Sequence, residues 1–248
     1  YLNENGQGPV AVSSLTPNRF HDPATAQMTL ANDAVDLRWF NGQSSLLVPQ
    51  DGPGTLVFSG WSALPPALVA YLPETEPEAI LPLRDTDENR PVTFYAVDGP
   101  AWLSTIYPHF REDVPNLSTE IAFGEPVSFL GADLPAQTLR AGDTLSLATL
   151  WQVHGPAEPE PVFFTHLVGP AGTPVAQADR LDVPAYYWRS GDVFIQLHEI
   201  VIPAGLPPGD YPLTIGIYYP QDGVRWPVQV DGEPAGETLT LTTITIQE

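Results

Sequence analysis

Alternation of apolar and polar residues is strongest in the second half of the chain, where it predicts β-strands. Every second residue is large and apolar in segment 211–219, and the same period of two recurs in 144–153 and 192–202. That period places one face of a strand against a core. Turn sequences rich in glycine, proline and aspartate separate these strands. The pattern predicts an antiparallel β-sandwich, immunoglobulin-like or jelly-roll-like, over residues 121–248.

Two local features of the sandwich are also predicted. Apolar positions in the last strand change phase near Thr242–Thr243, which indicates a β-bulge. Tyr211 directly follows the turn sequence LPPGD, so we assign its hydroxyl the role of tethering that corner.

The first 110 residues carry a mixed pattern. Short apolar runs that predict strands are interspersed with two segments of helical character, 23–31 and 64–72. Asp22 and Pro23 combine a favoured N-cap with the proline that suits the first helical position. Asn41-Gly42 lies between two apolar runs and predicts a two-residue hairpin turn. We therefore expect a small α/β unit here, which makes the whole chain α+β and mostly β.

The boundary between the two units is placed in a segment of weak periodicity. Residues 1–110 form the α/β unit, 111–120 a linker and 121–248 the sandwich. This division predicts that a fragment from Ile121 to Glu248 is stable in isolation.

Charge excludes some classes of partner. The chain has 30 acidic residues and 9 basic ones, all arginine, for a net charge of −21. Phosphate backbones and anionic headgroups are repelled by such a surface, so we predict neither nucleic-acid binding nor direct membrane insertion. No run of 18 apolar residues is present. Because the chain starts at Tyr1 and its one methionine is Met28, we expect a mature or excised piece of a longer protein.

Metal-binding patterns are weak. Asp85, Asp87 and Asn89 have the spacing that opens a calcium loop, but Arg90 and Ala96 stand where such a loop has glycine and glutamate. A solvated acidic turn is the favoured interpretation. The five histidines show no metal-ligand spacing. We therefore predict no metal site and no cofactor.

The sequence YYWRSGD is the best ligand-binding candidate. Neighbouring side chains alternate, so Tyr186, Tyr187 and Trp188 cannot all face one core. An exposed tyrosine or tryptophan ring can stack on a sugar, and Trp226 is a second candidate for such a platform. The alternative is that Trp188 packs over the mouth of the sandwich while Arg189 covers it by a cation–π contact.

Catalytic signals are absent from the sequence, and the cations have a structural interpretation. No nucleophile elbow and no phosphate loop is present, and nothing marks two of the many carboxylates as a glycoside-hydrolase pair. We therefore predict no catalytic residue.

Arg19 and Arg38 are scarce cations in an acidic unit, so each is expected to pair with a carboxylate, with an anion site as the alternative.

The order of several segments resembles a known family. VSSLTPNRFHDP, VDLRWFNGQSSLLVP and LVFSGWSALPPALVAYL resemble regions that follow the transmembrane helices in bacterial polytopic glycosyltransferases of the protein mannosyltransferase type. The stretch from Phe163 to Val228 is similar to the β-sandwich module found at the C-terminus of such proteins. The family's catalytic acidic residue lies in a loop between early transmembrane helices, so the resemblance transfers no catalytic residue to this chain.

The resemblance implies a non-catalytic, extracytoplasmic accessory region, periplasmic or at the cell surface, that is tethered to the membrane in its parent protein. Glycan, or the transmembrane part of the parent chain, is the implied partner. Two alternatives remain open from the sequence. A carbohydrate-binding or surface-adhesion module would expose an aromatic platform, whereas a glycoside hydrolase would hold two facing carboxylates in a cleft.

Overall fold

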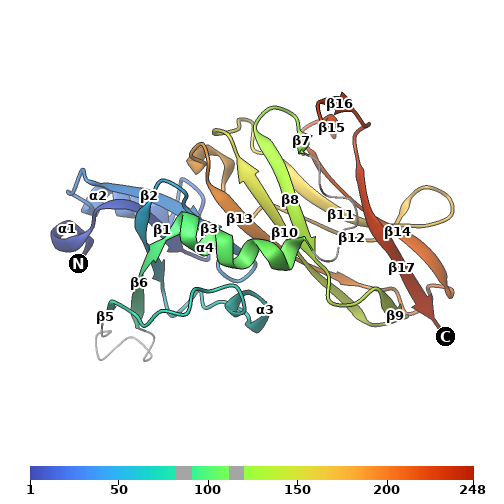
Figure 1. The fold of residues 1–248 in the computed structure, drawn as a ribbon, viewed down its shortest axis with the longest axis horizontal. Helices are drawn as coiled ribbons and strands as arrows, with labels where there is room; N and C mark the ends of the chain where they lie inside the picture. Colours follow the sequence, from blue (N-terminus) through green and yellow to red (C-terminus); the bar gives the residue numbers. More distant parts are fainter. Residues whose placement is uncertain (82–90, 112–119) are drawn as a thin grey trace.

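Two β-sheets built mainly from the second half of the chain face each other and form the predicted sandwich (Figure 1). The computed structural model describes residues 1–81, 91–111 and 120–248. One sheet has seven strands in the order β16 (Glu233–Pro234), β15 (Val228–Val230), β7 (Ile121–Phe123), β8 (Val127–Asp133), β10 (Thr144–Val153), β13 (Val193–Val201) and β3 (Ser45–Val48). The facing sheet has five, in the order β12 (Pro174–Arg180), β11 (Val162–Val168), β14 (Gly209–Tyr218), β17 (Leu239–Gln247) and β9 (Thr138–Arg140).

Aromatic side chains fill the space between these sheets. The Trp151 ring of β10 lies 4.8 Å from the Phe163 ring of β11, edge to face, and 5.2 Å from the Phe123 ring. All three side chains are fully buried. Removing each from water contributes about 1.5–3 kcal/mol, so these inward-facing side chains stabilise the sandwich. The mostly-β fold class is confirmed.

A buried histidine connects the two sheets. His198 of β13 is 1% exposed, and its Nε2 lies 2.9 Å from Thr149 Oγ1 of β10 in the same sheet. Its Nδ1 lies 3.1 Å from Thr165 Oγ1 of β11, across the sandwich. Burial lowers the pKa of His198 to about 3, so the ring is neutral and both nitrogens are paired.

Both local predictions for the sandwich hold. The Tyr211 hydroxyl donates a 2.8 Å hydrogen bond to the Pro207 carbonyl and so ties the corner before β14. The pairing of β14 with β17 shifts register between Thr240 and Thr242, so the extra residue is Leu241, next to the position predicted for the bulge.

The first part of the chain forms a separate mixed sheet. Its strand order is β2 (Val35–Phe40), β1 (Gly8–Ser13), β4 (Pro53–Phe58), β6 (Val92–Asp98) and β5 (Ala79–Leu81). The strand β1 runs parallel to both β2 and β4, whereas β6 is antiparallel to its neighbours. Helices accompany this sheet: α1 (Leu2–Asn5), α2 (Asp22–Thr29), α3 (Pro66–Val69) and α4 (Gly99–Ile106), followed by the short turn η1 (Tyr107–Phe110).

The helices occur close to their predicted positions. The helix α2 has Pro23 in its first turn, as expected, but Asp22 lies inside the helix and does not cap it. Its carboxylate accepts a hydrogen bond from the Ser14 hydroxyl instead. The second segment forms a single helical turn, α3.

The hairpin predicted at Asn41-Gly42 is wrong. The chain leaves the first sheet after β2, and β3 pairs antiparallel with β13 of the sandwich, with Val48 opposite Val193. All four residues of β3 are buried. Pairing with β13 buries both faces of this apolar run, whereas a hairpin on the first sheet would leave one face exposed, so the strand joins the sandwich. Gly42 serves close packing, since a Cβ there would lie 2.2 Å from Ser13 Oγ.

The two parts share one continuous core. Besides β3, the first part contributes α4 and η1, which lie alongside the seven-stranded sheet (Figure 1). Phe110 of η1 is fully buried in the same hydrophobic cluster as Trp151. Independent folding of the fragment from Ile121 stays a prediction. Across the described ranges, no helix is long and apolar enough to span a membrane.

Candidate functional site

The residues predicted as an aromatic platform are not exposed together. The Trp188 side chain is 1% exposed, its Nε1 donates to the Val183 carbonyl at 2.9 Å, and its ring stacks 6.0 Å from that of Phe194. Trp226 is 4% exposed and packs edge-on against Tyr219. The prediction of an exposed ring is therefore wrong for both tryptophans, since each fills the apolar end of a sheet. The alternative, in which Trp188 closes the mouth of the sandwich, is the one observed.

Arg189 has an ionic role instead of the expected cation–π contact. Its guanidinium donates to both carboxylate oxygens of Asp36 in β2, at 2.9 and 3.2 Å. The turn that follows the short helical segment η2 (Ala185–Tyr187) is thereby attached to the first sheet.

A buried arginine completes this junction between the first sheet and the sandwich. Arg38 of β2 is 1% exposed and donates to Asp51 at 2.8 Å, to Asp36 at 3.1 Å and to Asp192. The structural ion pair predicted for Arg38 is confirmed. Burial alone would lower the Arg38 pKa, but the hydrogen bond to Asp51 and the surrounding carboxylate charges raise it. The Arg38 hydrogen bond in turn lowers the pKa of Asp51.

Asp192 is the most deeply buried carboxylate of this cluster. It is 1% exposed, and burial raises its pKa to about 6 even though the Arg38 charge acts in the opposite direction. The cluster, called here the Arg38 joint, connects β2 to the turn before β13, because the Arg38 guanidinium lies between Asp36, Asp51 and Asp192 and pairs with all three.

Tyr186 and Tyr187 remain partly exposed, and Tyr186 lines a groove beside this joint. The groove, called here the Tyr186 groove, has a volume of about 290 Å³. Three loops and η2 form it, from both parts of the chain. Its lining consists of Asn18, Arg19, Phe20, Ala157, Glu158, Pro159, Glu160, Tyr186 and Gln221.

A tight turn presents the first-part residues of the groove. The Asn18 side chain accepts a 3.1 Å hydrogen bond from the Phe20 N–H, an Asx-turn that places Arg19 and Phe20 at its tip. The Arg19 N–H donates to the Tyr186 hydroxyl oxygen, which joins the turn to η2. The Arg19 guanidinium lies 5.5 Å from the Tyr186 ring centroid and 5.1 Å from that of Phe20. Both rings therefore lie within cation–π distance of one guanidinium.

Two glutamates provide acceptors in the groove. Glu158 lies 3.8 Å from the Arg19 guanidinium, so the carboxylate partner predicted for Arg19 is confirmed, although both side chains are largely exposed and the pair is weak. Glu160 Oε1 accepts a 3.0 Å hydrogen bond from the Ala185 N–H. The pKa of Glu160 is raised because surrounding groups displace water from its carboxyl, although the residue as a whole is exposed. The pKa of Tyr186 is also raised, mainly by burial.

Phe20 is the unusual residue of this groove. Its side chain is 77% exposed, among carboxylates, amides and a guanidinium. No sequence signal marked it, since a single phenylalanine in a turn has no period. The sequence PNRF indicates only the turn that carries Phe20, because the asparagine two residues before it, Asn18, favours an Asx-turn.

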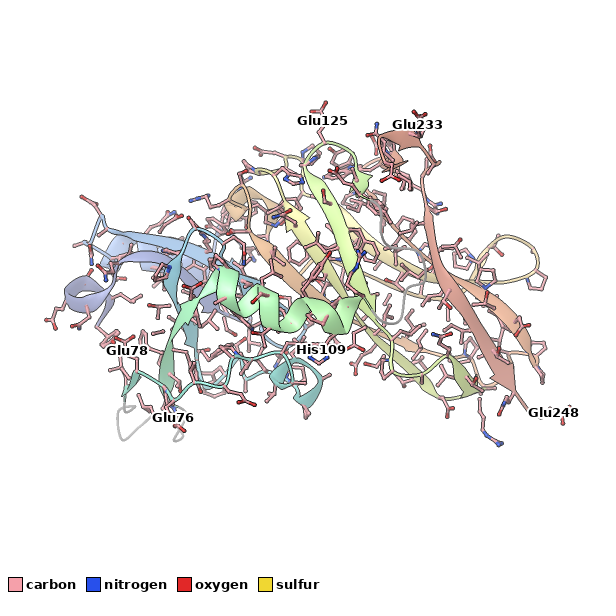
Figure 2. All side chains as sticks on the ribbon, in the orientation of Figure 1. Glu76, Glu78, His109, Glu125, Glu233 and Glu248 are labelled. Atoms are coloured by element: carbon pink, nitrogen blue, oxygen red, sulfur yellow. The ribbon has the colours of Figure 1, made fainter. Side chains whose placement is uncertain are left out.

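Most of the acidic surface lies elsewhere. Glu158 and Glu160 are the acidic residues that line the groove among the described residues, and Figure 2 shows Glu125, Glu233 and Glu248 at the periphery of the sandwich. Within 1–81, 91–111 and 120–248, no three histidine, aspartate or glutamate side chains are grouped for a metal ion. The weak metal candidates Asp85, Asp87 and Asn89 lie outside the described residues.

Comparison with known proteins adds little. No protein-family model and no curated protein matches this chain. Among solved structures, the crystal structure of the C-terminal domain of Wzt is similar to part of it, with a TM-score of 0.36 and 13% sequence identity. The match covers 58% of this chain and 85% of that one. Function has to be argued from the site itself.

Proposed function

We propose that this chain is a non-catalytic, extracytoplasmic accessory region of a membrane-embedded glycosyltransferase, and that it recognises carbohydrate in the Tyr186 groove. The observation that carries the proposal is the exposed Phe20 ring next to Tyr186, Glu158 and Glu160.

The chemistry of the groove suits a sugar. A pyranose ring has an apolar C–H face and a rim of hydroxyl groups. Phe20 and Tyr186 supply ring surface for the C–H face, while the Glu158 and Glu160 carboxylates and the Asn18 and Gln221 amides supply hydrogen-bond partners for the rim. Small-molecule sites commonly combine apolar surface with a few placed polar groups in this way.

The groove is also held in place before any ligand arrives. The Phe20 backbone is held by its Asx-turn, and Tyr186 is connected to that turn through the Arg19 N–H. The Arg38 joint fixes η2 and its following turn to β2. A groove with little left to order loses less conformational entropy on binding.

The accessory role rests on the sequence resemblance. The segments that resemble extracytoplasmic regions of mannosyltransferase-type proteins include VSSLTPNRFHDP, which forms the Phe20 turn. We propose that the parent protein tethers this region to the membrane and that the groove contacts a glycan or glycosylated acceptor near the parent's membrane core.

A glycan array tests the proposal. The purified chain is applied with two variants, Phe20→Ala and the matched control Met28→Ala, which removes an 80% exposed apolar side chain outside the groove. We expect binding to a restricted set of glycans that falls about tenfold in the Phe20 variant, since an aromatic contact contributes about 0.5–1.5 kcal/mol beyond its buried area. The control should bind like the wild type. An empty array, or equal loss in both variants, would count against carbohydrate recognition.

The same samples separate recognition from hydrolysis. If reducing ends were released from a bound glycan and Glu160→Gln stopped the release, the non-catalytic part of the proposal would be overturned in favour of a glycoside hydrolase.

A further inference from the structure

The Tyr186 groove contains a cation of its own, the guanidinium of Arg19. The central carbon of this guanidinium lies over the Phe20 ring, 5.1 Å from its centroid, and over the Tyr186 ring, 5.5 Å from its centroid. Both distances are within the range, about 6 Å, in which a positive charge is attracted to an aromatic face. Two rings from distant parts of the chain therefore meet at one place that stabilises a positive charge.

Two carboxylates add negative charge at the same place. Glu158 Oε1 lies 3.8 Å from the Arg19 guanidinium. Burial raises the pKa of Glu160, while the Ala185 hydrogen bond and the Arg19 charge oppose that rise, so Arg19 acts on this carboxylate too. Among the described lining residues, two carboxylates are thus opposed by one guanidinium, and the groove becomes more negative when that guanidinium is withdrawn.

The Arg19 guanidinium is held only weakly in this position. The Arg19 side chain is 53% exposed and its partner Glu158 is 78% exposed, and exposed ion pairs of this kind contribute little to stability. The attachment of the turn to η2 uses the Arg19 backbone N–H, which donates to the Tyr186 hydroxyl oxygen. The guanidinium can therefore leave the rings while the backbone hydrogen bond stays intact.

These charges determine which kind of sugar the groove favours. An anionic sugar would be repelled by Glu158 and Glu160 and by a chain of net charge −21. A neutral sugar brings no charge to compensate the Glu160 carboxylate, from which surrounding groups displace water. An ammonium group donates up to three hydrogen bonds and is attracted by both ring faces and both carboxylates. The groove therefore favours a sugar in which a free amine replaces a hydroxyl group.

We infer that the carbohydrate recognised in the Tyr186 groove is an amino sugar with a free ammonium group. That group takes the place of the Arg19 guanidinium beside the Phe20 and Tyr186 rings and pairs with Glu160, while the Arg19 side chain turns to solvent. The inference rests on the carbohydrate recognition proposed above and narrows it to one class of sugar.

Titration calorimetry with three matched trisaccharides tests the inference. The β-linked trimers of glucosamine, N-acetylglucosamine and glucose share one backbone and differ in a single substituent per ring, which is ammonium, acetamide or hydroxyl. The titrations are done at about pH 6.5, where an amine with a pKa of about 7.7 is mostly protonated. We expect the glucosamine trimer to bind about tenfold more tightly than the other two, because only its ammonium group forms charge-assisted pairs with the carboxylates.

Two variants test the exchange of cations, with circular dichroism to verify folding. Glu160→Gln keeps an oxygen for the Ala185 N–H but loses the charge, so it should remove most of the preference for the glucosamine trimer. Arg19→Gln removes the competing guanidinium and keeps the backbone N–H, so it should strengthen binding of that trimer about threefold. Glu125→Gln and Arg140→Gln are the matched controls, since both residues are exposed and outside the groove lining, and they should leave all three affinities unchanged.

The outcomes separate this inference from carbohydrate recognition itself. Equal affinity of the wild type for the three trimers, or Phe20-dependent binding of neutral or acidic array glycans alone, would overturn the inference and leave recognition in place. Weaker binding of the glucosamine trimer by Arg19→Gln would also overturn it, because Arg19 would then contact the sugar. An equal loss in Glu125→Gln and Glu160→Gln would overturn it too, since the acidic surface as a whole would then attract the trimer. Lack of binding of any glycan would overturn both proposals.

Discussion

Replacing Arg38 by methionine removes the cation of the joint while keeping much of its apolar volume. The change leaves Asp192, 1% exposed, without its guanidinium partner. Removing one member of a buried ion pair typically costs about 3–5 kcal/mol. For a domain of this size, that lowers the melting temperature by about 6–20 °C. Asp192 can take up a proton, which limits the penalty at acid pH because its pKa is already about 6. The loss should therefore be larger at about pH 8 than at about pH 5.

Urea and thermal unfolding at both pH values measure this loss. Arg140→Met is the matched control, because Arg140 is exposed and donates to the Glu248 carbonyl at the surface. It should cost less than about 0.5 kcal/mol. The double variant Arg38→Met with Asp192→Asn should recover part of the stability, since no buried charge is then left unpaired. If Arg38→Met cost less than about 1 kcal/mol at both pH values, the joint would not stabilise the fold as argued.

Three further predictions concern titration and hydrogen bonding. Burial raises the Asp192 pKa well above its usual range, to about 6. The folded state therefore holds this proton more tightly than the unfolded state, and this contribution to the free energy of unfolding is lost as pH rises from about 4 to about 6. In Asp192→Asn that decline, about 3 kcal/mol in the wild type, should be absent, so the stability difference between wild type and variant should change with pH across this window. His198 has the opposite sign: its pKa is lowered to about 3, so its contribution is present above about pH 6.5 and is lost as pH falls, and His198→Gln should flatten the acid limb of stability against pH. A stability profile of His198→Gln parallel to that of the wild type would contradict this. Tyr211→Phe removes the hydroxyl that ties the Pro207 corner and should cost about 1 kcal/mol in urea unfolding; no measurable cost would mean that the tether is dispensable.

Predictions from the sequence held where a local pattern decides the structure. The alternation in 211–219 gave β14, and the turn before Tyr211 gave its tether, because both depend on neighbouring residues. The prediction failed for Asn41-Gly42, where tertiary burial of β3 on β13 overrides the turn propensity.

The candidate site was only partly accessible to such reasoning. Tyr186 was one of the ligand-binding candidates and it lines the Tyr186 groove, but the sequence could not tell which of three consecutive aromatics stays exposed. Burial of Trp188 depends on two contacts distant in the sequence or set by the fold: its ring stacks on Phe194 and its Nε1 donates to the Val183 carbonyl. Phe20 and Glu160 are separated by 140 positions along the chain, so their proximity is a property of the fold alone.

The central claim is that carbohydrate is recognised in the Tyr186 groove, and a calorimetric titration tests it most directly. The strongest array glycan is titrated into the wild type, Phe20→Ala and Met28→Ala. The proposal predicts one-site saturable binding that is about tenfold weaker in Phe20→Ala and unchanged in Met28→Ala. Equal affinity in wild type and Phe20→Ala, or no saturation with any glycan, would contradict it.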